Sequence, residues 1–317
     1  MSRRAILLPV SVGMAERTFD LEPLGPYSLR QSGEFIGAWH EVPSDGTSPD
    51  GHLHLAFLTD GGWIPAAACV TQDPGGLVHA QVYGDAPLDA VRRQTARILS
   101  LDVDGRGWPA VGDRDPVVGR LQAMFPGFRP VNWANAYEAA AWSLISTRIS
   151  MRQGQGIKDR MSRELGPSVD VHGHRLYCFP GPDVLARLES FKGLFGRKVE
   201  YLNLLGQAAL AGELDTEKLR AMPRDEALAA LKRFKGIGEF GSQLVRLRAL
   251  SAVDEVPTAE PRILEAVATA YRLNHAPGVR DLEEIAEGWR PFRMWVAVCL
   301  RRILAGGAGM THSRATG

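Results

Sequence analysis

The sequence predicts an α+β protein made of a small N-terminal α+β domain with an antiparallel sheet, residues 1–112, and a larger all-helical domain. Three observations support this. Residues 17–84 contain short β-rich segments bounded by Gly, Pro, Asp and Ser. From about residue 113 the apolar spacing becomes helical. The charge divides at the same point, with 8 basic and 13 acidic residues in 1–112 and 29 and 23 in 113–317.

The N-terminal part is predicted to contain four strands and one helix after a first strand near residues 5–10. Asp60-Gly61-Gly62 is typical of a hairpin turn. An amphipathic helix is expected from Asp89 to Leu99. The predicted strands are Thr18–Leu21, Phe35–Trp39, His52–Phe57 and Val78–Tyr83.

The second part, residues 113–305, is predicted to be entirely helical, and residues 306–317 to form a flexible tail because they are rich in Gly, Ser and Thr. Short Gly or Pro segments separate the helices. The predicted helices are Val117–Met124, Asn135–Ile145, Met151–Leu165, Asp183–Leu188, Lys198–Ala211, Thr216–Ala221, Asp225–Phe234, Phe240–Leu250, Arg262–Tyr271, Leu282–Ala286 and Pro291–Leu304.

Composition and length exclude several classes of protein. The 317 residues are 45% hydrophobic and 23% charged, which is typical of globular domains and not of disordered chains. No apolar run reaches the roughly 18 residues of a membrane span. The N-terminal apolar stretch lacks a cleavage signature, so the expected location is cytoplasmic.

Metal chemistry is not favoured by the spacing of Cys and His. Cys69, Cys178 and Cys299 lie far apart and form no CxxC pair, so they are interpreted as buried thiols. His172 and His174 have a spacing that suits a metal, but no third ligand lies near them in the sequence. No cofactor is therefore expected.

A glycine motif, Gly236-Ile237-Gly238-Glu239-Phe240-Gly241, has two interpretations. It matches the dinucleotide-binding pattern G-x-G-x-x-G, but that motif must follow a strand, and residues 225–235 are patterned as a helix. The alternative is helix, tight hairpin, helix. Its second helix would point free N–H groups at a DNA phosphate, although an ordinary αα-corner has the same pattern.

Downstream of the hairpin, Pro257-Thr258-Ala259-Glu260 places a carboxylate at the start of a new helix. With this order of motifs the sequence resembles the helix-hairpin-helix DNA glycosylases. Three further segments resemble their 3-methyladenine DNA glycosylase II branch, and the resemblance covers about residues 115–305. They are Asn135–Ile145 continuing to Ser150, Gly196–Leu202, and Ala286–Arg293, which contains Trp289-Arg-Pro-Phe-Arg.

The resemblance implies a two-lobed helical domain with a cleft and an enzyme of base excision repair. Such an enzyme binds double-stranded DNA, flips a damaged base such as 3-methyladenine or 7-methylguanine, and hydrolyses its N-glycosidic bond. Glu260 stands where the family has its catalytic Asp, and Asp254 is a weaker candidate partner. A first-turn acid can also simply complement the helix dipole. Phe240 occupies the position of the Lys nucleophile of related lyases, which implies hydrolysis without strand cleavage.

The remaining predicted site residues fall into three groups. Phe240, Trp142, Tyr137 and Trp295 are candidates for an aromatic base pocket, because cationic purines stack on electron-rich rings. Thr147 and Arg148 match the loop that fills the gap left by the flipped base, and Lys235, Gly236, Gly238, Phe240, Gly241 and Arg246 are expected to contact the DNA backbone. Backbone carbonyls at Phe234 and Ile237 are expected by resemblance to hold K⁺ or Na⁺.

Two functional hypotheses remain open at this point. The first is a monofunctional glycosylase, acting as a monomer associated with the nucleoid. The second is a protein with the same cleft that binds DNA lesions but has lost catalysis through the exchange of Asp for Glu at residue 260.

Overall fold

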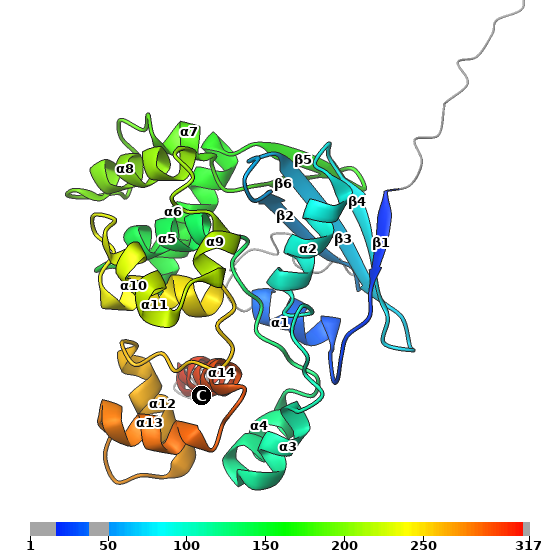
Figure 1. Ribbon diagram of the computed structural model, residues 1–317, viewed down its shortest axis with the longest axis vertical. Coiled ribbons are helices and arrows are strands. Elements are labelled where there is room, and N and C mark those ends of the chain that lie inside the picture. The colour runs from blue at the N-terminus through cyan, green and yellow to red at the C-terminus, as the bar shows by residue number, and fades with distance from the viewer. Residues whose placement is uncertain (1–16, 38–50, 313–317) are drawn as a thin grey trace, which may run out of the picture.

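The computed structural model describes residues 17–37 and 51–312 of the chain. It contains a four-stranded antiparallel sheet, a separate β-hairpin and a large helical part (Figure 1). This confirms the predicted mixture of helices with a small antiparallel sheet. The predicted strand near residues 5–10 lies outside the described residues.

The sheet has the strand order β1-β4-β3-β2, with every neighbouring pair antiparallel. Side chains alternate between its two faces. Leu53, Leu55 and Phe57 of β2 enter the main core, whereas Ala67 and Cys69 of β3 face the opposite side. The strands are β1 (Thr18–Leu21), β2 (Leu53–Leu58), β3 (Pro65–Gln72) and β4 (Val78–Tyr83).

Two N-terminal predictions need correction. The segment from Phe35 was expected to be a strand, but it completes helix α1 (Leu29–Gly37), whose buried side includes Leu29 and Phe35. Strand β3 was not predicted, because its run of small residues has weak β-propensity. The expected turn at residues 60–62 does join β2 to β3, with Gly61 in the left-handed region.

The helical part also contains one unpredicted β-hairpin. Strands β5 (Ser168–Val171) and β6 (His174–Tyr177) pair through a two-residue turn and pack on the sheet face that carries Ala67 and Cys69. The prediction of an all-helical second part is therefore wrong here. Four-residue strands give too short a pattern to be distinguished from a loop by sequence.

Most helices overlap the predicted ranges, apart from α1 and α3, which were not predicted. Helix α14 continues to His312 and so includes part of the predicted tail, whose flexibility stays a prediction. The other helices are α2 (Leu88–Ile98), α3 (Trp108–Arg114), α4 (Pro116–Met124), α5 (Ala136–Ser146), α6 (Met151–Leu165), α7 (Pro182–Leu185), α8 (Lys198–Leu210), α9 (Thr216–Ala221), α10 (Arg224–Lys232), α11 (Glu239–Arg248), α12 (Pro261–Tyr271), α13 (Val279–Glu287) and α14 (Arg293–His312).

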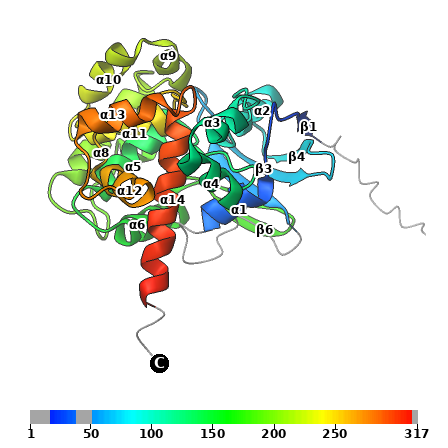
Figure 2. The ribbon, with the colours of Figure 1, turned by 90° about the horizontal axis from the view of Figure 1, so that it is seen from below.

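Two large cores hold these elements together. One is formed mainly by α5, α6, α8 and α11. The other joins the inner face of the sheet to α3, α4, α12, α13 and α14, so sequence-distant ends of the chain share one core. Figure 2 shows α14 lying between α12 and α4. The domain boundaries near residue 112 stay a prediction, because the larger core extends across that point.

No helix in the described part of the chain is long and apolar enough to cross a membrane. All three cysteines lie within that part, and each is buried without a disulfide.

Candidate functional site: an aromatic, basic cleft with one carboxylate

A cleft of about 750 Å³ opens between the α5–α6 turn, helix α11, the start of α12 and helix α14. This volume lies within the range of small-molecule sites in proteins. Six basic residues line it, and among its described lining residues Glu260 is the single acid. The basic residues are Arg152, Lys158, Arg248, Arg262, Arg301 and Arg302.

Glu260 lies at the residue before α12, and its side chain makes no capping hydrogen bond to that helix. Glu260 therefore does not cap α12 through its side chain, and the alternative that its charge complements the dipole of α12 stays open. Pro257 and Pro261 restrict the backbone on either side, and the Glu260 amide donates to the Pro257 carbonyl at 3.1 Å. The Arg301 Nε lies 3.9 Å from a Glu260 carboxylate oxygen. The carboxylate is therefore held in the cleft beside one guanidinium.

Gln243 of α11 connects the hairpin to the loop that carries Glu260. Its amide nitrogen donates to the Thr258 hydroxyl at 2.9 Å and to Glu239 at 3.0 Å. Its amide oxygen accepts from the Ala259 backbone N–H at 3.0 Å. The side chain is only 5% exposed. Sequence analysis missed Gln243, because its role depends on contacts with residues 15 and 16 positions away.

Aromatic rings form one wall of the cleft. Trp142 and Phe240 line it, as predicted, and Phe240 is 42% exposed. Trp133, which was not predicted, stacks against Trp142 with ring centroids 5.5 Å apart. Lys158 lies 5.4 Å from the Trp133 ring and pairs with Glu138 at 2.9 Å.

The two other predicted pocket aromatics belong to the cores and do not line the cleft. Tyr137 is 1% exposed, and its hydroxyl donates to the Pro180 carbonyl at 2.9 Å. Trp295 is fully buried and packs on Phe292 with ring centroids 4.7 Å apart. Their assignment to the base pocket is corrected on this basis, since both rings are covered by protein.

Asp254 also lies outside the cleft lining. Its carboxylate accepts from Arg290 at 2.6 Å and from Arg293 at 2.7 Å. Both arginines come from the segment that resembles the family's C-terminal signature. Asp254 therefore anchors the loop before Glu260 to the start of α14, and this geometry does not support a catalytic partnership.

The hairpin between α10 and α11 has the predicted geometry of a tight glycine turn. Gly236 has φ +87°, and a Cβ there would lie 2.5 Å from Cδ2 of Tyr201. Gly238 has an ordinary φ of −97°, and a Cβ there would meet nothing within 4 Å. Because Gly238 has no side chain, nothing from that residue caps the first turn of α11. Gly241 packs closely on Ser143 of α5.

Lys235 and Arg246 were both predicted to contact the DNA backbone. Lys235 is exposed beside this turn, whereas Arg246 is largely covered by protein. The Arg246 side chain is 13% exposed and pairs with Glu255 at 3.0 Å. Its predicted contact with DNA is corrected to an internal ion pair between α11 and the loop before α12.

Thr147 and Arg148 form the exposed turn between α5 and α6. Arg148 has φ +58°, and the Thr147 hydroxyl donates to the Ser143 carbonyl at 2.7 Å. Ser146 and Ile149, on either side, line the cleft.

The expected cation at Phe234 and Ile237 stays a prediction. The Phe234 carbonyl accepts from the Ile237 amide at 3.0 Å.

Burial shapes the charge of the cleft wall. Arg248 is enclosed beside Phe35, and burial lowers its pKa to about 10. Burial also lowers the pKa of Arg301, while Glu260 acts in the opposite direction. An arginine pKa of about 10 lies well above neutral pH, so the Arg248 side of the cleft wall carries positive charge.

Comparisons with known proteins agree with this fold. The chain matches no protein-family model. It is 23% identical over 210 residues to the DNA-3-methyladenine glycosylase of Bacillus subtilis (strain 168), covering 65% of this chain and 69% of that protein.

Two solved structures share the fold. The 3-methyladenine DNA glycosylase of Archaeoglobus fulgidus has a TM-score of 0.74 and 22% identity, over 89% of this chain and 96% of that one. The Clostridium acetobutylicum 8-oxoguanine glycosylase/lyase, in complex with double-stranded DNA, has a TM-score of 0.65 and 15% identity. The match covers 86% of this chain and 90% of that one.

Proposed function

From the helix-hairpin-helix glycosylase fold, and from curated relatives that support membership in that superfamily, we propose that this chain is a monofunctional DNA glycosylase for alkylated purines. One observation carries the proposal. Glu260, the single carboxylate among the described lining residues, stands without a capping bond in a basic and aromatic cleft beside a glycine hairpin. The reaction is hydrolysis of the N-glycosidic bond, which releases the base and leaves an abasic site.

The aromatic wall suits a cationic base. Purines alkylated at N3 or N7 carry positive charge, and such rings are attracted to electron-rich π faces. Trp133, Trp142 and Phe240 supply these faces in the cleft. Flipping a base from the duplex costs a few kcal/mol, and this cost is smallest for a damaged base that stacks poorly.

Glu260 supplies the negative charge that the transition state requires. As the glycosidic bond breaks, positive charge develops at C1′ of the sugar. A carboxylate about 4 Å away, at an effective dielectric near 20, stabilises that charge by about 4 kcal/mol. This corresponds to roughly a thousandfold in rate. Phe240 offers no amine at the position of the Lys nucleophile in related lyases, and the Lys158 amine that lines the cleft is paired with Glu138. The proposed nucleophile is therefore water, and the DNA strand stays intact.

The hairpin is proposed to bind the DNA backbone. A helix N-terminus carries about half a positive charge and unpaired N–H groups, which favours a phosphate. The open space at Gly238 lets a phosphate approach the first turn of α11, and Lys235 adds a charge next to it.

The test is release of 3-methyladenine and 7-methylguanine from methylated duplex DNA, measured by liquid chromatography and mass spectrometry. We expect Glu260→Gln to reduce release by about a thousandfold while binding of abasic duplex persists. Glu265→Gln is the matched control, because Glu265 lies exposed on α12. Unchanged release by Glu260→Gln would contradict the role of Glu260.

A lesion-binding protein without catalysis is the second candidate. The observation that favours it is the Arg301 guanidinium 3.9 Å from the Glu260 carboxylate, which attracts this group away from a substrate. This candidate predicts salt-sensitive binding of lesion-containing duplex and no base release by the wild-type protein.

A further inference from the structure

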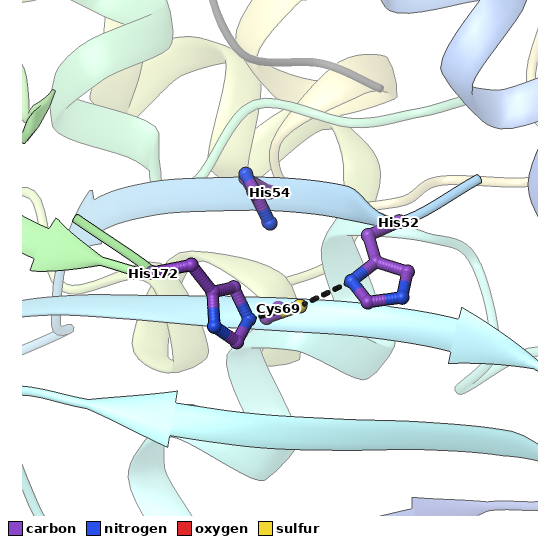
Figure 3. A group of neighbouring side chains, drawn as sticks. All are labelled: His52, His54, Cys69 and His172. Carbon is purple, nitrogen blue, oxygen red and sulfur yellow. Dashed lines mark hydrogen bonds between the residues drawn. The ribbon is translucent and has the colours of Figure 1, made fainter. Parts of the chain in front are cut away.

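Three histidines and one cysteine converge on the outer face of the sheet, away from the cleft lining described above. They are His52, His54, Cys69 and His172 (Figure 3). His54 and Cys69 are directly opposite each other on the antiparallel pair β2–β3. His52 lies two residues before His54 and therefore on the same face. The turn of the β5–β6 hairpin places His172 above these strands.

The donor atoms have the spacing of a metal site. One ligand atom from each residue lies within 4.8 Å of all the others. The Cys69 Sγ is 3.5 Å from Nδ1 of His52 and 3.4 Å from Nε2 of His172. In a tetrahedral zinc site with normal bond lengths, a sulfur and a nitrogen ligand are about 3.6 Å apart. The two ligand atoms that lie farthest apart, up to 4.8 Å, must come closer by about 1–1.5 Å through side-chain movement to reach this geometry.

A second layer orients His172 toward the thiol. The Tyr83 hydroxyl donates to the Gln81 side chain at 2.8 Å, so its oxygen can accept from a ring N–H of His172. That oxygen lies 3.3 Å from Nδ1 and 3.2 Å from Nε2. In the tautomer that carries its proton on Nδ1, His172 donates to Tyr83 and its Nε2 lone pair is available 3.4 Å from Cys69 Sγ. Metal-bound histidines commonly use their second nitrogen in this way.

We propose that these four residues bind one divalent zinc-type ion. Imidazole and thiolate are the ligands of zinc and of similar borderline metals, whereas Ca²⁺ and Mg²⁺ select oxygen. A single cysteine does not support an iron–sulfur cluster, which takes four ligands of this kind. Cys69 is 5% and His54 9% exposed, while His172 is exposed, so the ion enters from the hairpin side.

The ion fastens the hairpin of residues 168–177 to the N-terminal sheet. His172 is the ligand from the hairpin, and its partners come from strands about 100 residues earlier. This explains why the sequence, which offered only the pair His172 and His174, did not predict a site. His174 is exposed in β6 and is not part of the cluster.

The test uses tag-free, full-length protein loaded with Zn²⁺ or Co²⁺ and then desalted. We expect about one equivalent of bound metal by mass spectrometry. The Co²⁺ form should show intense visible d–d bands of a tetrahedral ion and a thiolate charge-transfer band. Removal of the metal should lower the melting temperature, because an ion that binds only the folded state stabilises it.

Matched variants make the test specific. His172→Asn removes one ligand without backbone strain, because residue 172 has φ +50° and Asn tolerates this conformation. It should weaken metal binding at least tenfold, and Cys69→Ser should abolish the charge-transfer band. His174→Gln should bind as the wild type does. Circular dichroism confirms that each variant is folded.

Two results would overturn the proposal. The first is less than about 0.2 equivalents of metal on loaded wild-type protein. The second is an equal loss of binding in His172→Asn and His174→Gln, which would indicate adventitious surface binding. Neither result depends on glycosylase activity.

Discussion

Gln243 is the residue whose contacts best explain how Glu260 is positioned. It joins Glu239 at the start of α11 to Thr258 and Ala259 in the proline-bounded loop. The side chain therefore fixes the distance between the proposed phosphate-binding hairpin and the proposed catalytic carboxylate. We classify it as a positioning residue, because its bonds hold the loop backbone.

Replacing Gln243 by Ala should reduce kcat about ten- to hundredfold with little change in KM. The reason is that a displacement of the Glu260 carboxylate by about 1 Å has an effect of this size on the rate. Unfolding free energy should fall by about 1–3 kcal/mol, because the Ala259 N–H loses its buried acceptor. Single-turnover kinetics and urea denaturation measure both effects. Gln207→Ala, at an exposed position of α8, is the control. An unchanged kcat would contradict the positioning role.

The two hairpin glycines should respond oppositely to alanine. Gly236→Ala is strained at φ +87° and clashes with Tyr201, so we expect a loss of stability of about 1–3 kcal/mol. Gly238→Ala meets open space at an ordinary φ, so stability should stay within about 0.5 kcal/mol. The methyl group of Gly238→Ala should nevertheless weaken DNA binding severalfold.

Thermal denaturation and fluorescence anisotropy with duplex DNA separate these effects. If Gly238→Ala binds DNA as the wild type does, the phosphate does not approach α11 at this turn.

Residue roles were predictable from sequence only where a local motif constrains them. Glu260 follows from the Pro-x-x-acid pattern, and the structure places it in the cleft. Trp142 and Tyr137 belong to the same predicted helix, and sequence spacing does not say which side of a fully buried helix meets a cleft. The structure shows that Trp142 lines it and that Tyr137 packs inside.

At the scale of elements, two basic residues of the helix-hairpin-helix unit, Lys235 and Arg246, differ in exposure and in partner. Lys235 is exposed at the turn, whereas Arg246 pairs with Glu255 between α11 and the loop to α12. The two residues therefore serve different functions, although both lie on the same basic element.

Lys235→Ala should weaken DNA binding about equally for all sequences and lower the slope of log K against log salt by about 1. Arg246→Ala should instead lower unfolding free energy by about 1–3 kcal/mol, because Glu255 loses its closer partner and keeps only the Arg224 guanidinium at 3.5 Å. Salt titrations of DNA binding and chemical denaturation distinguish the two. A sequence-selective loss in Lys235→Ala would contradict a phosphate contact.

Element prediction succeeded where the pattern is long and failed where tertiary contacts decide. Helix α6 was predicted with the observed ends, since 15 residues give four helical turns and a Ser150 capping box. The segment around Phe35 is β-rich locally, but its apolar residues fit a helix that packs on the core. The β5–β6 hairpin is stabilised by the sheet beneath it, which the local sequence does not show.

At the scale of the whole molecule, the N-terminal sheet and the C-terminal helices form one continuous core. Arg129 illustrates the connection, because its buried guanidinium donates to the carbonyls of Leu24, Pro26, Ser100 and Val103. Its other side lies 5.3 Å from the ring of Trp295 in α14. Contacts of this kind between distant segments lie beyond a prediction based on local patterns, which places a boundary near residue 112.

A continuous core predicts that the full chain unfolds in one cooperative transition and that residues 113–317 alone do not fold stably. In that fragment α14 would lose its contacts with Trp108 of α3 and with Gln31 and Glu34 of α1, and it would expose apolar surface. Differential scanning calorimetry should give equal calorimetric and van't Hoff enthalpies for the full chain. The fragment should melt without a cooperative transition, and adding residues 1–112 as a separate chain should restore it. A cooperative melt of 113–317 alone, at the temperature of the full chain, would show instead that the helical part is an independent domain.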